Sequence, residues 1–198
     1  MESEISVREW YNSVGEKCLN FYKKSNKNEK IILRELIKRL PKDSLILDVG
    51  CGTGRPAKFL AKKGYKLICI DISEKMLKAA QKNVPNAKFK KMSMYNMKFK
   101  DKSFEGAIAF FSFLHLEKKK IKKIFKDLNK FLKKDGYLVF SVNKGVGEGY
   151  FEYFGEKVYV SEYTKKELTE LIKNTGFKTI LQKDFLVPGL KGKDITIY

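Results

Sequence analysis

Three evenly spaced glycines and one aspartate are the residues of this sequence best suited to hold a ligand. Residues 47–55 read LDVGCGTGR, so Gly50, Gly52 and Gly54 stand at every second position after a short apolar run. Glycine lets the backbone take up positive φ and approach a ligand closely. The start of a following helix offers free N–H groups and a partial positive charge. Asp71 ends the next apolar run, where an acid can bind both hydroxyls of a ribose.

The spacing of the glycines discriminates between ligands. A dinucleotide site uses G-x-G-x-x-G, whose third glycine would fall where Arg55 stands. A nucleoside triphosphate loop would end in Gly-Lys-Ser or Gly-Lys-Thr, which is absent here. The pattern G-x-G-x-G therefore argues against both of these ligand classes.

Short apolar runs alternate with amphipathic stretches along the rest of the chain. This alternation predicts an α/β fold with a mostly parallel, doubly wound sheet and helices on both faces. Residues 186–193 are too few for a helical crossover, so the last two strands should pair antiparallel. The expected helices are 5–40, 55–63, 74–82, 117–133 and 164–175, and the expected strands are 45–49, 66–71, 87–92, 107–111, 137–142, 177–185 and 194–198.

The segment DVGCGTG at 48–54, the acid Asp71 and the ISEKML run at 72–77 resemble the class I methyltransferases that use S-adenosylmethionine (SAM). The resemblance is closest to the group that includes the ubiquinone- and menaquinone-biosynthesis enzymes. KSFE at 102–105 and KDGYL at 134–138 extend it over almost the whole chain. It implies one domain over 1–198 and a Rossmann-like sheet of seven strands, in the order 3-2-1-4-5-7-6, with the last strand antiparallel.

The resemblance also implies roles for individual residues. The glycines would line the methionine part of SAM, Asp48 would reach its amino group, and Asp71 would bind the ribose. Ile72 would lie against the adenine, and Phe110, Phe111 and Ser112 would form the wall nearest the methyl group. The cofactor-binding residues expected on this basis are Asp48, Gly50, Cys51, Gly52, Gly54, Asp71, Ile72, Met76, Ser93, Met94, Phe110 and Phe111.

Ser93 is a departure from the family pattern, because relatives often carry an acid after the third strand to accept a hydrogen bond from the adenine amino group. A serine can accept that bond but gives less charge assistance. The backbone N–H of Met94 could still meet the ring.

His115, the only histidine, follows the fourth expected strand. It is a candidate general base, and an equally weighted alternative is a structural residue that orders the loop. Tyr11 and Tyr22 are candidates to cover the cofactor, with packing of an amphipathic helix as the alternative. Arg55 could contact the SAM carboxylate or face solvent at the start of its helix.

Residues 144–163 carry six aromatic side chains beside a glycine cluster. We interpret them as a lid over the substrate, with Tyr150, Tyr153 and Tyr159, together with Tyr11, as substrate contacts. A hairpin packed on the domain or on a second subunit is the alternative. Residues 1–40 would form a helical cover over the other side of the site.

The net charge of +19 suggests a polyanionic partner, whereas a general lysine bias explains it without one. Only four of the 42 basic residues are arginine, which favours the bias.

Three cysteines without metal-ligand spacing argue against a metal site and suit a reduced, cytoplasmic setting. We expect no signal peptide and no membrane span.

The leading hypothesis is therefore a SAM-dependent methyltransferase that acts on a small molecule and releases S-adenosylhomocysteine (SAH). The alternatives are an RNA or protein methyltransferase and a SAM-binding module without catalysis. The absence of an Asn/Asp-Pro-Pro-Tyr/Phe motif after the fourth strand disfavours the methyltransferases of nucleic-acid amino groups. A monomer and a homodimer both remain open.

Overall fold

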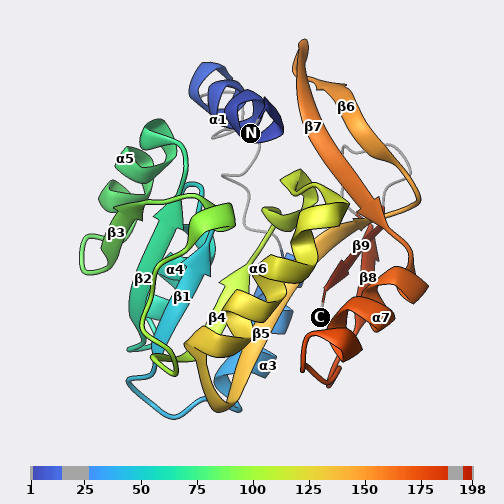
Figure 1. Ribbon diagram of the computed structural model, residues 1–198. Coiled ribbons are helices and arrows are strands. Elements are labelled where there is room, and N and C mark those ends of the chain that lie inside the picture. Colours follow the sequence, from blue (N-terminus) through green and yellow to red (C-terminus); the bar gives the residue numbers. More distant parts are fainter. Residues whose placement is uncertain (1, 15–26, 187–193, 198) are drawn as a thin grey trace.

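A twisted sheet with helices on both faces is the framework of the protein (Figure 1). The computed structural model describes residues 2–14, 27–186 and 194–197. The strands are β1 (Leu45–Val49), β2 (Lys66–Asp71), β3 (Lys88–Lys91), β4 (Phe104–Ala109), β5 (Leu132–Lys144), β6 (Glu148–Tyr153), β7 (Glu156–Tyr163), β8 (Lys183–Leu186) and β9 (Asp194–Ile197). The helices are α1 (Glu2–Ser13), α3 (Lys27–Ile37), α4 (Arg55–Ala61), α5 (Glu74–Asn83), α6 (Lys118–Phe131) and α7 (Lys165–Asn174), with short 3₁₀ turns η1 (Met94–Asn96) and η2 (Phe113–His115).

The first five strands run parallel in the order β3-β2-β1-β4-β5. β9 pairs antiparallel with β5 through residues 141–143, and β8 pairs antiparallel with β9. With β8 and β9 as the sixth and seventh strands of the sequence prediction, the order is 3-2-1-4-5-7-6. The expected fold class and the antiparallel last strand are therefore confirmed.

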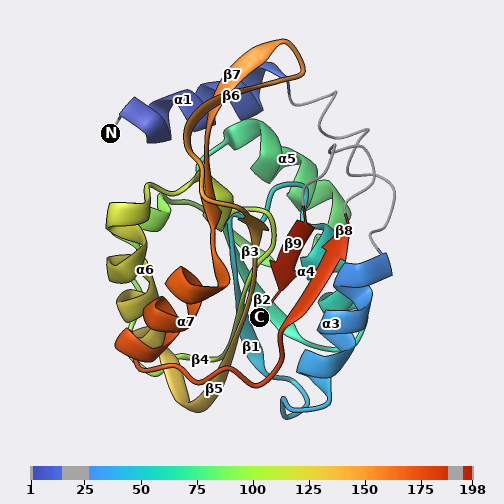
Figure 2. The same cartoon turned by 90° about the vertical axis from the view of Figure 1, so that its right-hand side faces the viewer.

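Two apolar cores lie on opposite faces of the sheet, as the alternation of side chains along a strand requires. In β1, Leu47 and Val49 face the core under α6 and α7, whereas Ile46 faces the core under α3, α4 and α5. Figure 2 shows these helices on the two sides of the sheet. β1 is buried on both faces, so its nearly continuous apolar sequence is the pattern expected of a central parallel strand.

Within the predicted lid segment, residues 148–163 form an antiparallel hairpin, β6–β7, that stands beyond the end of the sheet (Figure 1). α1 packs against β7, and together they form a third apolar cluster that includes Trp10, Leu114 and Val160. The indole Nε1–H of Trp10 donates to the Tyr153 carbonyl (3.3 Å) and the hydroxyl of Ser13 donates to Glu156 (2.7 Å). Helix and hairpin thus pack as one unit above the carboxyl ends of the strands.

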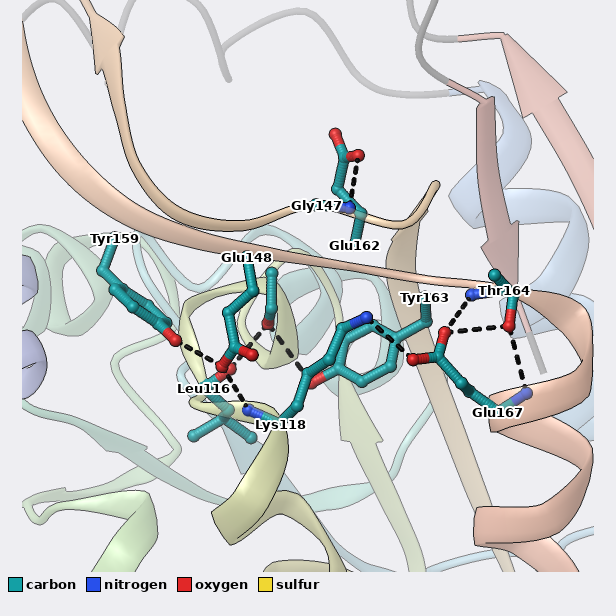
Figure 3. A network of polar contacts seen from close by, with 10 residues as sticks. Leu116, Lys118, Gly147, Glu148, Tyr159, Glu162, Tyr163, Thr164 and Glu167 are labelled. Carbon is teal, nitrogen blue, oxygen red and sulfur yellow. Dashed lines mark hydrogen bonds and ion pairs between the residues drawn. The ribbon is translucent and has the colours of Figure 1, made fainter.

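A polar network joins the base of the hairpin to the start of α6 and to α7 (Figure 3). Glu148 accepts hydrogen bonds from the Lys118 backbone N–H (2.8 Å) and from the Tyr159 hydroxyl. The Lys118 ammonium in turn bonds Glu167 (2.8 Å). The residue before α6, Glu117, makes no side-chain cap. The hairpin therefore supplies the acceptor that this helix start needs.

Several predicted boundaries were wrong. The helix expected over 5–40 is two helices, α1 and α3, and the second ends at Ile37; Tyr22 lies outside the described residues. β5 begins at Leu132 rather than 137, because Leu132 already pairs with Phe104 across a register shift. The strand expected over 177–185 starts only at 183, because the Phe177 N–H still bonds the end of α7.

The start of α7 offers a test of the local physics. Thr164 and Glu167 form the capping box that the sequence predicts: the Glu167 N–H donates to the Thr164 hydroxyl (3.2 Å) and the Thr164 N–H donates to Glu167 (2.7 Å). We expect Thr164→Ala to lower the free energy of unfolding by about 1 kcal/mol in urea denaturation. Thr169→Ala, on the exposed face of the same helix, is the control and should stay within about 0.5 kcal/mol. Equal effects of the two variants would contradict this account of the cap.

Candidate active site

A pocket that is open at one side lies at the carboxyl ends of β1, β2 and β4, with about 970 Å³ of empty space when the solvent at its mouth is included. This edge is where ligands bind in open parallel sheets. The glycine loop after β1 and the loops after β2 and β4 form its walls, and α1 contributes Glu4, Val7 and Tyr11. These three residues are spaced at helical period, so one face of α1 covers the pocket.

The glycine loop has the backbone geometry that its sequence predicts. Gly50, Gly52 and Gly54 have φ values of +69°, +51° and +73°. A Cβ on Gly50 would come within 2.5 Å of the Cβ of Ser112, so this position cannot carry a larger residue without displacing the loop after β4. Gly54 lies against Ala80 of α5 and does not line the pocket. Two of the glycines are thus needed for packing within the site.

Asp71 bonds the backbone of two loops. Its Oδ2 accepts from the Gly52 N–H and its Oδ1 from the Ser73 N–H, both at 2.8 Å. Burial raises the pKa of Asp71, and the backbone hydrogen bonds from Ser73, Gly52 and Ile72 oppose that rise. A carboxylate offers about four lone-pair positions, so acceptor capacity remains for a ligand hydroxyl.

Asp48 is a buried carboxyl group without a full set of partners. It is 1% exposed, and its Oδ2 has no hydrogen-bond partner within the described part of the chain. Burial, together with the nearby charges of Asp71 and Glu29, raises the pKa of Asp48 well above its usual range. An isolated buried carboxylate is costly, so its place in the pocket wall indicates a ligand that supplies a donor or a positive charge.

Arg55 and Glu29 form an ion pair beside the glycine loop. Glu29, from α3, is 2% exposed. Burial raises the pKa of Glu29 to about 7, against the opposing attraction of Arg55. The guanidinium reaches the pocket wall, but its charge is largely matched by this partner.

His115 is held on both ring nitrogens. Nδ1 lies 2.8 Å from the Tyr159 carbonyl, which can only accept, so Nδ1 carries the proton. Nε2 then accepts from the Tyr11 hydroxyl at 2.9 Å. Burial lowers the pKa of His115 to about 4, against the bond to Tyr159. The ring is therefore neutral near pH 7.

Most of the site residues predicted from the sequence come together in this pocket. Those that line it are Asp48, Gly50, Cys51, Gly52, Asp71, Ile72, Met76, Met94, Phe110, Phe111, Ser112, Tyr11 and His115. Gly54, Ser93, Tyr150, Tyr153 and Tyr159 do not line it. The Ser93 hydroxyl instead accepts from the Tyr95 N–H (3.0 Å) at the start of η1, and Tyr150 is half exposed on the hairpin.

The sequence reasoning missed eight residues of the site or of its immediate support. Glu29 supports Arg55 from behind, and the other seven line the pocket: Glu4, Val7, Thr53, Pro56, Met92, Tyr95 and Leu116. The i, i+3, i+7 spacing of Glu4, Val7 and Tyr11 could have shown that they share a helix face. Nothing in the local sequence of Glu29 indicates its partner, which is 26 positions away.

Comparison with known proteins gives the family. Residues 46–136 match the family described as methyltransferase domain. The uncharacterized protein MJ1252 of Methanocaldococcus jannaschii is 30% identical over 89% of this chain and 78% of its own length. The carboxy-S-adenosyl-L-methionine synthase of Nautilia profundicola is 29% identical over 91% of this chain and 89% of its own length.

The fold is also that of a solved methyltransferase. The 1,6-didemethyltoxoflavin-N1-methyltransferase of Burkholderia thailandensis, crystallised with 1,6-didemethyltoxoflavin and SAH, has a TM-score of 0.80 at 17% identity. The likeness covers 99% of this chain and 87% of that one. The match to the methyltransferase-domain family shows that the chain belongs to the SAM-dependent methyltransferases, and its fold is that of class I.

The residues of the pocket fit the cofactor of that class. The unsatisfied oxygen of Asp48 suits an ammonium group, and the glycine loop leaves room for a ligand against its backbone.

No cluster of three or more histidine, cysteine, aspartate and glutamate side chains in the described ranges could hold a metal ion. Likewise, none of the helices described has the length and apolar character to cross a membrane.

The Glu29–Arg55 pair generates a prediction about pH. The folded pKa near 7 exceeds the value of 4.5 for an unburied glutamate, so between these pH values the folded protein binds more protons than the unfolded chain. Glu29 therefore lowers the free energy of unfolding as pH rises from 4.5 to 7, by on the order of 3 kcal/mol. Glu29→Gln should gain stability relative to the native protein over this range, measured by urea denaturation at several pH values.

Glu35→Gln is the matched control. Glu35 lies on the same helix, but its surface pairs with Lys38 and Arg39 lower its pKa. This variant should therefore not gain relative stability as pH rises. A Glu29→Gln curve parallel to that of the native protein would contradict the assignment.

Proposed function

We propose that the protein transfers the methyl group of SAM to a small-molecule acceptor that binds between the glycine loop and α1. The observation that carries this proposal is the roofed pocket itself: α1 crosses above a cavity whose wall contains both the unsatisfied Asp48 oxygen and Asp71. A covered cavity of this kind is better suited to a small acceptor than to a polymer.

The residues that would hold the cofactor follow from their chemistry. Asp48 would bind the amino group, and the free lone pairs of Asp71 would bind the ribose hydroxyls. Ile72, Met76 and Met94 offer apolar surface for the adenine. When bound, SAM supplies a methyl group already activated on a sulfonium. The protein then has to orient the acceptor and exclude water, and such positioning can contribute roughly 7–11 kcal/mol.

We also propose that α1 and the β6–β7 hairpin are the cover of the site. The two ends of α1 are hydrogen-bonded to opposite sides of the pocket, through Ser3 to Glu117 (2.8 Å) and through Ser73 to Asn12 (2.7 Å). Tyr153 and Tyr159, which the sequence suggested as substrate contacts, pack in the apolar cluster with α1, whereas Tyr150 contacts the ring of Tyr159. Residues 144–163 therefore act on the acceptor through α1 and His115.

Two other activities are less well supported by the pocket. An RNA acceptor would bring phosphates to a wall whose ionisable side chains are mostly acidic. Synthesis of carboxy-S-adenosyl-L-methionine, as in the name of the Nautilia relative, needs a cation for the added carboxylate. Arg55 is the only lysine or arginine of the described pocket wall, and it is paired with Glu29. Methyl transfer to a small molecule is therefore favoured.

For His115 the geometry supports a positioning role better than that of a general base. A group with a pKa of about 4 holds a proton poorly near pH 7, whereas a base works best with a pKa close to the working pH. Its Nε2 lone pair is already used by Tyr11. We propose that His115 fixes the Tyr11 hydroxyl, which faces the acceptor.

Cofactor binding is the direct test of the function. Isothermal titration calorimetry should detect SAM and SAH binding to the native protein and none for NAD or ATP. Asp71→Asn should weaken SAH binding roughly ten- to a hundredfold, because hydrogen bonds to a charged carboxylate contribute about 1.5–3 kcal/mol. Asp101→Asn, on an exposed turn, is the control and should bind SAH as the native protein does. Heat from NAD or ATP instead of SAH would refute the proposal.

The state of His115 can be read from a single NMR signal, because the chain has one histidine. A ¹⁵N-detected imidazole spectrum should show the Nδ1–H tautomer and no titration between about pH 5 and 8. Tyr11→Phe should move the Nε2 resonance, because that nitrogen loses its donor. A pKa near 7 in the native protein would restore the general-base role.

A further inference from the structure

The pocket is acidic in a chain that is otherwise strongly basic. The chain carries a net charge of +19, yet the ionisable side chains of the pocket wall with formal charge are Glu4, Asp48, Asp71 and Arg55. Glu29 matches Arg55, which leaves three carboxyl groups facing the cavity. A site with this distribution favours ligands with positive charge.

Two of the three carboxyl groups have a task in the proposed cofactor site. Asp48 has an unsatisfied oxygen for one cationic donor, and Asp71 is bonded to the backbone of the loops after β1 and β2. Glu4 is left over. It is half-buried in the pocket wall, and no cation among the described residues lies within ion-pair distance of it. A carboxylate in this position lacks the charge that would balance it.

The position of Glu4 is well defined by its helix. The neighbouring Ser3 bonds Glu117 at the start of α6, and Glu4 shares its helix face with Val7 and Tyr11. Tyr11, Tyr95 and Phe111 line the same cavity. Aromatic faces together with a carboxylate form a good environment for an ammonium group.

Apart from its carboxyl groups, the described pocket wall lacks a base. His115 is neutral, weakly basic and occupied at both nitrogens. An aliphatic alcohol would need a strong base to remove its hydroxyl proton, whereas an alkylammonium, with a pKa of about 10 like that of lysine, can lose its proton to water and expose a nucleophilic lone pair. The lack of a strong base in the described pocket wall therefore favours an amine acceptor, and the acidic wall favours the same class of compound.

We infer that the acceptor is an amine, and that Glu4 binds its ammonium form and selects it over neutral and anionic compounds. This inference rests on the proposed methyl transfer. The bound ammonium first releases one proton to water. The amine then forms one N–C bond while the S–C bond of the donor breaks, with its electron pair left on sulfur. Glu4 and Tyr11 orient the amine from the same face of α1.

Three matched probes test the inference by binding rather than by turnover: benzylamine, benzyl alcohol and benzoate. Each is titrated calorimetrically into the protein saturated with SAH. We expect benzylamine to bind at least tenfold more tightly than benzyl alcohol, and benzoate to bind most weakly. Glu4→Gln should abolish the preference for the amine and leave SAH affinity unchanged.

Glu9→Gln is the control, because Glu9 lies on the exposed side of α1 and pairs with Arg8. It should keep the preference for benzylamine. Equal or tighter binding of benzyl alcohol or benzoate, or no binding of benzylamine at millimolar concentration, would overturn the inference. Weaker SAH binding by Glu4→Gln would also overturn it, because Glu4 would then belong to the cofactor site. Failure of the native protein to bind SAH would instead refute the proposed function.

Discussion

The hydrogen bond from the Gly52 N–H to Asp71 is the interaction on which the rest of the site depends. It closes the loop after β1 onto the end of β2, and the second carboxylate oxygen fixes the start of α5 through Ser73. The position of Gly50 against Ser112 adds the loop after β4 to the same arrangement. The ends of three strands are thus held together by the Asp71 carboxylate and by the close approach that glycine at position 50 permits. The cavity is the space above these strand ends.

The electrostatics of the pocket follow from its burial. A carboxyl group taken out of water is unfavourable in its charged form, which explains why the pKa values of Asp48, Asp71 and Glu29 are all raised. Only Glu29 has a charged partner within the described residues. Burial of these carboxyl groups therefore disfavours their charged forms, and a cationic ligand would offset that unfavourable free energy. In the proposed function this applies both to the ammonium group of the cofactor and to an amine acceptor.

The sequence was sufficient for those parts of the fold that depend on neighbouring residues. The strand before the glycine loop, the strand that ends at Asp71 and the capping box at Thr164 have the predicted boundaries, because apolar patterning and caps act within one element. The strand order was reached through the family resemblance. The roles of the site residues stay predictions, although most of those residues line one cavity.

What the sequence could not give are the pairings between distant segments. Ser3 and Glu117 are 114 positions apart, and Tyr11 and His115 are 104 apart, so no local pattern records either contact. Yet these contacts decide the chemistry: a lone histidine in a loop suits a general base, whereas the same ring between Tyr11 and the Tyr159 carbonyl is a fixed acceptor. In the proposed function the covering helix supplies both Tyr11 and Glu4, so the part of the chain farthest in sequence from the fourth strand would control what reaches the methyl group. On this proposal the sheet edge fixes the donor and the cover selects the acceptor.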